Sequence, residues 1–364
     1  MKIICTQKNL HQGLTYTTRI INSGAALPVL NNILFKTDQG RLKISATNLE
    51  IAVNTWVGGK IEEEGELTIP AKPINEYIAS LPAERIVISA QNETMKLAGE
   101  NTETHIKGLP AEEFPLIPRV EGEVYGKVNG KDLKLAISEV AYATAFSETQ
   151  PEISGVLFRF EEKTLTLAAT DRYRLAEKKL PLSGEGVSAR QIIIPARAVG
   201  EIGRIMGEGE VEIFLTESQA CFRADAIELI TRLIDGQYPD YKQIVPKSFT
   251  TEVKINRPKF VQSLKATSVF ASDTNNVEFF VNPASKELVI KSQSSQIGDS
   301  EIHLGVEGEG EKNSIIFNYR YLLECLNNLT DEEVNLRLIS PSSPAEIIPA
   351  GREDYLYLVM PIKI

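Results

Sequence analysis

The chain has 364 residues, a formal net charge of −10 and a hydrophobic content of 42%. This length exceeds that of one ordinary domain, because single hydrophobic cores stop growing beyond about 250–300 residues, and it therefore predicts two or three domains. The composition is that of a folded chain and excludes global disorder. If the negative charge is evenly spread, it argues against a nucleic-acid partner.

Several other classes of protein are excluded by simple features. Residues 1–8 lack the apolar core of a signal peptide, and no run approaches the ~18 apolar residues of a membrane span. Three widely separated cysteines (Cys5, Cys221 and Cys325) fit a reducing compartment. The three histidines are too scattered to form a zinc site. We therefore expect a cytoplasmic protein with no membrane contact, no metal and no other cofactor.

The first third of the chain begins with a predicted helix over 7–22. The segments 32–37 and 41–48 alternate apolar and polar residues around a short turn, which predicts a hairpin. Further along, period two changes to spacings of three and four, so a strand is expected to lead into an amphipathic helix over 71–81. A proline-bearing segment, 114–118, closes this part.

The middle third repeats the same order of elements. A helix is predicted over 130–147, a hairpin over 155–160 and 164–171, and a second helix over 196–207. The proline-bearing segment that closes this part is 238–241.

The last third repeats the order again. It has predicted helices over 257–271 and 318–329, with a hairpin over 277–281 and 287–293 between them. A more distant form of the proline segment, 358–361, closes the chain.

The spacing of equivalent residues supports an internal repeat. Ala46 and Ala169 are 123 residues apart, as are Ala169 and Ser292. The chain is therefore predicted to contain three tandem α+β domains, 1–121, 122–247 and 248–364. Their strands are expected to be mostly antiparallel, because the hairpin links are too short for parallel crossovers.

The charge is unevenly distributed between helices and the rest of the chain. Six segments around the predicted helices together carry +8, which leaves −18 for the remainder: 6–24, 71–81, 127–147, 196–207, 254–272 and 318–329. If the helices share one surface, that surface is positive and can contact phosphates without reading sequence. The alternative is that these lysines and arginines only decorate solvated helix faces.

Catalytic signatures are missing from the sequence. There is no G-x-x-x-x-G-K-[ST] loop, no recognisable nucleophile elbow and no evident carboxylate pair. We therefore do not expect an enzyme, although a scattered catalytic triad cannot be seen in a sequence.

Two segments call for a separate interpretation. The polar run 170–175 follows an apolar strand and differs from its counterparts in the other two repeats, so it predicts either a site particular to this domain or a turn with solvated arginines. The apolar tail 356–364 is predicted to contain a strand, and its Met360 and Pro361 could line an apolar pocket.

These features together resemble the bacterial sliding clamps, the beta subunits of DNA polymerase III, over essentially the whole chain. The resemblance is carried by 27–33, 169–176, 235–241 and 359–364. It implies three tandem copies of a DNA-clamp domain, each with antiparallel sheets outside and two helices inside. Two chains would close head to tail into a six-domain ring.

The ring of this family encircles duplex DNA and gives the replicative polymerase its processivity, without catalysis. The resemblance implies binding of the polymerase III catalytic subunit, the clamp loader, other polymerases and repair proteins through short peptide motifs. It also implies a cytoplasmic protein that associates with the nucleoid during replication.

The same resemblance implies two sets of site residues. The peptide pocket would comprise Ile153, Thr170, Arg172, Tyr173, Arg174, Leu175, Pro239, Ile244, Asn318, Tyr321, Pro344, Leu358, Met360, Pro361 and Ile362, with Arg174 at its rim. The residues expected to face DNA are Lys72, Arg197, Arg204, Lys8, Arg19 and Gln150. Relatives often carry basic residues in the loop 22–26 and at position 150, so DNA contact at both places is expected to be weaker.

Two competing functions stay open at this level. One is an enzyme on a repeated α+β scaffold, and the other is a ring-shaped interaction scaffold that does not hold DNA.

Overall fold

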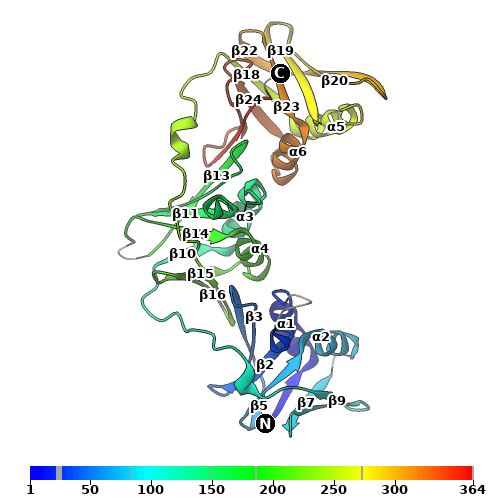
Figure 1. Ribbon diagram of the computed structural model, residues 1–364, viewed down its shortest axis with the longest axis vertical. Helices are drawn as coiled ribbons and strands as arrows, with labels where there is room; N and C mark the ends of the chain where they lie inside the picture. The colour runs from blue at the N-terminus through cyan, green and yellow to red at the C-terminus, as the bar shows by residue number, and fades with distance from the viewer. Residues whose placement is uncertain (22–26, 83, 148, 185–186, 272–273, 363–364) are drawn as a thin grey trace. The chain divides into compact units, whose positions relative to one another are not determined.

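The computed structural model describes residues 1–21, 27–82, 84–147, 149–184, 187–271 and 274–362. It contains two compact units, and Figure 1 shows their strands and helices. The first unit comprises Met1–Lys134, Ser183–Val187 and Arg197–Leu233. The second comprises Leu135–Leu182, Ser188–Ala196 and Ile234–Ile364.

The first unit is built on two antiparallel sheets. In spatial order, the smaller sheet contains β5 (Lys60–Glu63), β1 (Lys2–Thr6), β7 (Arg85–Gln91), β8 (Thr94–Ala98) and β9 (Glu103–Lys107). The larger contains β10 (Gly126–Asn129), β15 (Glu210–Leu215), β16 (Gln219–Ala224), β17 (Ile227–Arg232), β4 (Ile51–Val57), β3 (Arg41–Thr47), β2 (Asn32–Asp38) and β6 (Glu66–Pro70).

Helices of the first unit pack on these sheets through apolar stripes. They are α1 (Gln7–Thr18), α2 (Ala71–Ser80) and, from its second residue, α4 (Ala196–Ile205). Helices α1 and α2 lie side by side (Figure 1). Thr6 begins α1 by accepting a hydrogen bond from the Asn9 amide at 3.3 Å. At Gly13, a Cβ atom would lie 2.7 Å from Val57 Cγ2, so glycine allows α1 to approach β4 closely.

The second unit also contains two antiparallel sheets. The larger contains, in spatial order, β14 (Arg190–Pro195), β11 (Gly155–Glu161), β12 (Thr164–Thr170), β13 (Arg174–Pro181), β26 (Tyr355–Val359), β25 (Ala345–Pro349), β24 (Glu333–Leu338), β18 (Thr251–Asn256) and β22 (Glu307–Gly310). The smaller contains β21 (Gly298–Gly305), β20 (Glu287–Ser294), β19 (Asn276–Asn282) and β23 (Asn313–Asn318).

Two helices of the second unit, α5 (Arg257–Ser268) and α6 (Tyr319–Asn328), lie side by side (Figure 1). Helix α3 (Gly130–Val140) begins in the first unit and ends in the second. Short 3₁₀ turns complete the described elements: η1 (Pro28–Asn31), η2 (Ala111–Glu113), η3 (Ala141–Ala143), η4 (Pro151–Ser154), η5 (Tyr241–Ile244) and η6 (Pro283–Ser285).

The predicted hairpins and helices are confirmed, with shorter helices than the sequence pattern indicates. The three predicted hairpins are β2–β3, β11–β12 and β19–β20. Helix α3 ends at Val140, whose φ of −122° leaves the helical region, and a 3₁₀ turn replaces its predicted last part.

The charge count along the helices needs correction. Lys127 lies on β10 and Lys254 on β18, although both fall in segments counted with the helices. Lys127 forms ion pairs with Glu210 at 2.7 Å and Glu212 at 3.1 Å, and Lys254 forms one with Glu333 at 3.3 Å. Two of the positive charges are therefore neutralised on the sheets.

An equivalent pairing of two antiparallel strands occurs once in each unit. In the second unit this pairing positions the candidate functional site. In the first unit β4 pairs antiparallel with β17, so Ile51 lies opposite Thr231. In the second unit β13 pairs antiparallel with β26, and Arg174 lies opposite Val359. Each pairing extends one sheet across two successive repeats of the sequence.

All three cysteines are predicted to resist alkylation in the native protein. Each is buried, and burial raises the pKa of the Cys5 and Cys325 thiols to about 12. Because the thiolate is the reactive form, iodoacetamide at pH 8 should modify none of them until a denaturant is added. Mass spectrometry measures the number of adducts, and rapid modification of the native chain would contradict this packing.

Candidate functional site

The polar run after β12 forms a tight turn held by its own side chains. Thr170 Oγ1 donates to the Arg174 carbonyl at 2.6 Å and accepts from the Arg172 amide at 3.1 Å. Asp171 Oδ1 accepts from the amides of Tyr173 and Arg174, at 2.9 and 3.0 Å. The turn brings Arg172 to a φ of +77°, which leaves its side chain and that of Tyr173 exposed.

Arg174 is buried beneath this turn rather than at a solvated rim, which corrects the sequence-based expectation. Its Nε donates to Asp171 Oδ2 at 3.0 Å, its Nη1 bonds Glu324, and its Nη2 donates to the Tyr142 carbonyl at 2.9 Å. The guanidinium carbon also lies 4.6 Å from the ring centre of Tyr321. Arg174 therefore joins the turn to α6 and to η3, which follows α3.

The net effect of these contacts on Arg174 is to stabilise its charge. Burial alone would lower the pKa of the guanidinium, but Tyr357, Glu324 and Asp171 raise it above its usual value. A buried charge with two carboxylate partners and a carbonyl partner is fully compensated, so the side chain is a fixed part of the site.

The tail is held by two backbone hydrogen bonds, one to this turn and one to β23. The Met360 amide donates to the Tyr173 carbonyl at 2.8 Å, and the Ile362 amide donates to the Ile316 carbonyl on β23 at 2.8 Å. Within the strands, Leu358 lies opposite Leu175. The polar run and the tail, about 185 residues apart in the sequence, are therefore neighbours in the structure.

An apolar cluster forms the base of this region. Leu175 and Leu358 are each at most 2% exposed and pack in one cluster with Tyr238 and Tyr241. In contrast, Tyr173 and Ile244 are 58% and 50% exposed. Exposed apolar groups beside a packed apolar base are typical of a surface that binds apolar side chains.

The remaining predicted pocket residues have different local roles. Asn318 is the N-cap of α6, and its side chain accepts from the Arg320 amide at 3.0 Å. Pro344 directly precedes Ala345, which lies opposite Val359. Ile153, on η4, is 2% exposed and thus part of the core, whereas Pro239 is exposed.

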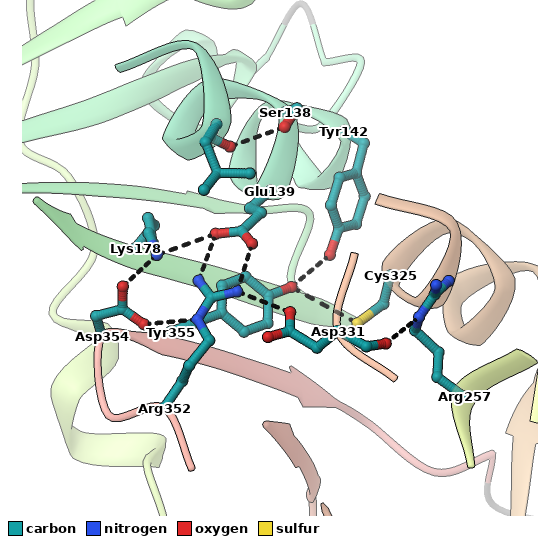
Figure 2. A network of polar contacts seen from close by, with 11 residues as sticks. Ser138, Glu139, Tyr142, Lys178, Arg257, Cys325, Asp331, Arg352, Asp354 and Tyr355 are labelled. Carbon is teal, nitrogen blue, oxygen red and sulfur yellow. Dashed lines mark hydrogen bonds and ion pairs between the residues drawn. The ribbon is translucent and has the colours of Figure 1, made fainter. Parts of the chain in front are cut away.

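A buried network of charges lies behind this region (Figure 2). Glu139, on α3, is fully buried and accepts two hydrogen bonds of 2.9 Å from Arg352. Lys178, on β13, lies 3.3 Å from Glu139 and also pairs with Asp354. Arg352 donates further to Asp331 at 2.8 Å and to Asp354 at 2.9 Å. Two cations and three carboxylates thus link α3 and β13 to the loops beside β24 and β26.

A neutral set of contacts lies next to Arg352, whose guanidinium carbon is 5.9 Å from the ring centre of Tyr355. The hydroxyl groups of Tyr142 and Tyr355 lie 3.0 Å apart, and the Cys325 sulfur lies 3.6 Å from the Tyr355 oxygen (Figure 2). The carbonyl of Tyr142 is the one that accepts from Arg174. Tyr142 therefore contacts Tyr355 through its hydroxyl group and Arg174 of the turn through its carbonyl.

Sequence reasoning missed this network, although one signal was present. Glu139 follows the buried Ala136 by three residues and precedes the buried Val140, so an acid stands within the apolar stripe of a predicted helix. Such a position indicates a buried charge that needs a partner. The partners Lys178 and Arg352 cannot be identified from periodicity, because they are distant in sequence.

The residues expected to face DNA differ in how free their charges are. Lys72, on α2, has an 85% exposed side chain and lies 4.0 Å from Glu76, and Lys8 on α1 and Arg19 at its C-terminal end are exposed too. Arg204, 62% exposed, forms an ion pair of 2.7 Å with Glu201. The Arg197 side chain donates to the Ile20 carbonyl at 3.2 Å, so it is held at the end of α1.

The sequence predicts weaker DNA contact at two places, the loop 22–26 and Gln150. The loop 22–26 lies outside the described residues. Gln150 is half-buried at the start of η4, and its side-chain oxygen is buried without a hydrogen-bond partner. The structure therefore gives Gln150 a less accessible position than the lysines of α1 and α2.

Among the residues that the structure describes, no group of three or more His, Cys, Asp or Glu side chains is placed to hold a metal ion. In the same part of the chain, every helix is too short or too polar to cross a membrane.

Comparisons with known proteins cover the whole chain. Three family profiles match in succession: the N-terminal domain of the DNA polymerase III beta subunit at 1–118, its central domain at 127–240 and its C-terminal domain at 242–363. A protein of Synechococcus elongatus named beta sliding clamp is 29% identical over 373 residues and is covered completely, as is this chain.

Solved structures give the same result. The DNA polymerase sliding clamp of Bacillus subtilis has a TM-score of 0.95 at 25% identity, over 100% of this chain and 99% of that one. The DNA polymerase III beta subunit of Thermotoga maritima has a TM-score of 0.92 at 26% identity, with the same coverage.

Removing one member of the buried network should destabilise the second unit. We expect Glu139→Ala to lower the free energy of unfolding by about 1–3 kcal/mol, because Arg352 and Lys178 would each lose a buried hydrogen-bonding partner while keeping their other carboxylates. Glu139→Gln, which retains an acceptor, should cost less. Urea denaturation followed by fluorescence measures both variants.

The matched control for this measurement is Glu161→Ala. Glu161 has a 56% exposed side chain and a single ion pair of 3.5 Å with Arg159, so its removal should leave the unfolding free energy nearly unchanged. Equal stability of Glu139→Ala and the wild type would show that the network contributes nothing.

Proposed function

Since the chain belongs to the DNA polymerase III beta subunit family, the bacterial sliding clamps, we propose that it works as a head-to-tail homodimeric ring around duplex DNA. A DNA sliding clamp is a non-catalytic processivity factor. In this proposal each chain contributes three domains, 1–121, 122–247 and 248–364, and the ring acts in the cytoplasm on nucleoid DNA.

The recurring strand pairing is the observation that carries this proposal. Strands β4 and β17 join the first repeat to the second, and β13 and β26 join the second to the third. Strand β21 is the equivalent, in the third repeat, of β4 and β13. Its partner should therefore be the strand of the first repeat that is equivalent to β17 and β26, and that strand is β9. Strands β9 and β21 each end their own sheet, so their edges are available for pairing between two chains.

Contact with DNA is proposed to be weak and independent of sequence. Lys72, Lys8 and Arg19 present exposed cations that can approach phosphates, and Arg204 adds a cation already shared with Glu201. We assign a smaller part to Arg197 and Gln150, because both side chains are partly engaged or buried. Few and mobile phosphate contacts suit a ring that must slide.

The region around the turn 170–174 and the tail is proposed to bind short peptide motifs of partners. These partners are the polymerase III catalytic subunit, the clamp loader, other polymerases and repair proteins. Tyr173, Ile244 and Met360 would contact the apolar side chains of the peptide, above the base formed by Leu175 and Leu358. Arg174 would hold the turn in its binding geometry and would not bind the peptide through its charge.

The ring proposal predicts retention that depends on DNA topology. On nicked circular plasmid the protein, once loaded, should co-elute with DNA in gel filtration, and cutting the plasmid once should release it, because only the closed ring prevents dissociation. Light scattering of free protein should give twice the chain mass. A monomer in solution, or equal loss from circular and linear DNA, would contradict the encircling ring.

The tail is predicted to be essential for peptide binding. A chain that ends at Val359 keeps β26 but loses the hydrogen bonds of Met360 and Ile362 with Tyr173 and Ile316. Its affinity for a fluorescent peptide from the polymerase catalytic subunit should fall at least about tenfold, since an apolar wall of the pocket is removed. The dimer mass should stay unchanged.

The control for this truncation is Ile297→Ala, which removes an exposed apolar side chain from a loop of the same unit. It should bind the peptide as the wild type does. Undiminished affinity of the truncated chain would refute the assignment of the tail.

A further inference from the structure

We propose that the first unit carries a second peptide-docking pocket, formed by the turn between β3 and β4, the end of β17 and the segment 115–118. Its occupant would be a short segment of another protein with two apolar side chains and an Asp or Glu beside them. The inference rests on the proposed peptide function of the region around 170–174, which we call the first pocket.

The turn of the second pocket is built by the same hydrogen bonds as the turn of the first. Thr47 Oγ1 donates to the Ile51 carbonyl at 3.0 Å and accepts from the Leu49 amide at 3.0 Å. Asn48 Oδ1 accepts from the amides of Glu50 and Ile51, at 3.0 and 2.8 Å. In the first pocket the same roles belong to Thr170 and Asp171, at positions 123 residues later.

The backbone confirms this equivalence. Leu49 has a φ of +75°, and Arg172, 123 residues later, has a φ of +77°. Left-handed backbone is unfavourable for a residue with a Cβ atom, so the side-chain hydrogen bonds of each turn hold it there. Both turns consequently present two exposed side chains, Leu49 and Glu50 in the second pocket and Arg172 and Tyr173 in the first.

The strand beside the turn is equivalent as well. Ala52 lies opposite Ile230 on β17, as Leu175 lies opposite Leu358 on β26. Pro115 follows the buried Phe114, as Pro239 follows the buried Tyr238. The second pocket therefore has the base, the turn and the proline segment of the first.

A cavity of about 100 Å³ lies at this place, lined among others by Leu49, Ala52, Pro115, Leu116 and Ile230. Leu116 is 92% exposed and Leu49 48% exposed, so two large apolar side chains face solvent beside a hollow that Thr47, Gln219 and Arg232 also line. Small-molecule pockets usually measure about 300–1,000 Å³, and this smaller hollow suits one anchoring side chain of a peptide.

The charge of the second pocket selects a different occupant. Ile51 stands where the first pocket has Arg174, and Arg232 stands where it has Met360. Arg232 is exposed, and within the described residues no carboxylate forms an ion pair with it. An unpaired guanidinium at the rim favours a carboxylate on the ligand.

The position of Glu50 indicates how the occupant is oriented in the second pocket. Its exposed side chain occupies the place that Tyr173 has in the first pocket. An acidic side chain of the occupant would be repelled there and attracted to Arg232, so the acid should lie at the β17 side of the pocket and the apolar pair near Leu49 and Leu116.

The test uses the fluorescein-labelled peptide Asp-Leu-Leu-Phe and full-length protein. The first pocket is blocked by Met360→Glu, which places a charge beside its apolar base. We expect this variant to bind one probe molecule per chain. A second substitution in the same chain, either Leu116→Asp or Arg232→Glu, should weaken that binding at least about tenfold. A probe with Asn in place of Asp should bind about three times more weakly, the effect of an exposed ion pair.

Controls separate loss of the pocket from loss of folding. Lys265→Glu, an exposed charge reversal on α5, should leave probe binding unchanged. In the wild type, isoleucine methyl NMR signals of Ile117 and Ile230 should shift on addition of the probe, which needs no variant at all.

The proposal is overturned if the Met360→Glu chain binds no probe, or if its binding is insensitive to Leu116→Asp and Arg232→Glu. The two pockets can fail separately. If Met360→Glu leaves the stoichiometry at the wild-type value while Leu116→Asp lowers it, the first pocket is wrongly placed and the second stands.

Discussion

The hydrogen-bonding capacity of strand edges is the constraint on which this structure depends. An edge strand exposes unpaired N–H and C=O groups, and each repeat of this chain closes its own hairpins but leaves one edge on either side. The pairings of β4 with β17 and of β13 with β26 satisfy those edges within the chain. The edges of β9 and β21 are among the sheet ends that the described chain leaves unpaired, and in our proposal their pairing between chains is the step that makes a ring from a repeat.

The same pairing explains why a docking surface can arise at the joint between repeats. Where two sheets merge, the turn that leads into the paired strand and the segment that follows its partner come side by side, as Tyr173 and Met360 do. The proposed first pocket is then reinforced by charge: Arg174 pairs with Asp171 and Glu324, and the network around Glu139 links α3 and β13 to neighbouring loops. Strand pairing sets the register, and the buried charges limit movement around it.

Much of the architecture could be predicted from the sequence because it depends on local patterns and on repetition. The change from period two to helical spacing located the helices, and the 123-residue spacing between Ala46, Ala169 and Ser292 indicated the repeats. The ends of the helices were less predictable, because α3 ends through the backbone conformation of Val140, which no side-chain pattern encodes.

The polar part of the site was beyond sequence reasoning for a different reason. The burial of Arg174 depends on Tyr142 and Glu324, which lie on other elements, so its partners appear only when the fold is known. Charge counting also failed locally, since Lys127 and Lys254 are on strands and paired with glutamates. The assignment of individual residues to peptide or DNA comes from the family resemblance, because no local pattern distinguishes these side chains from other exposed ones.

In the two turns that precede β4 and β13, some residues determine the backbone geometry and others determine what the turn can bind. Their geometry is set by the threonine and the Asx residue at the first two positions, Thr47 with Asn48 and Thr170 with Asp171, through bonds to backbone atoms. The next two positions point outward and take no part in those bonds with their side chains. Leu49 and Glu50 in one turn, and Arg172 and Tyr173 in the other, can therefore diverge without loss of those bonds. A duplicated domain can thus acquire a new binding preference by changing two residues while keeping the scaffold that presents them.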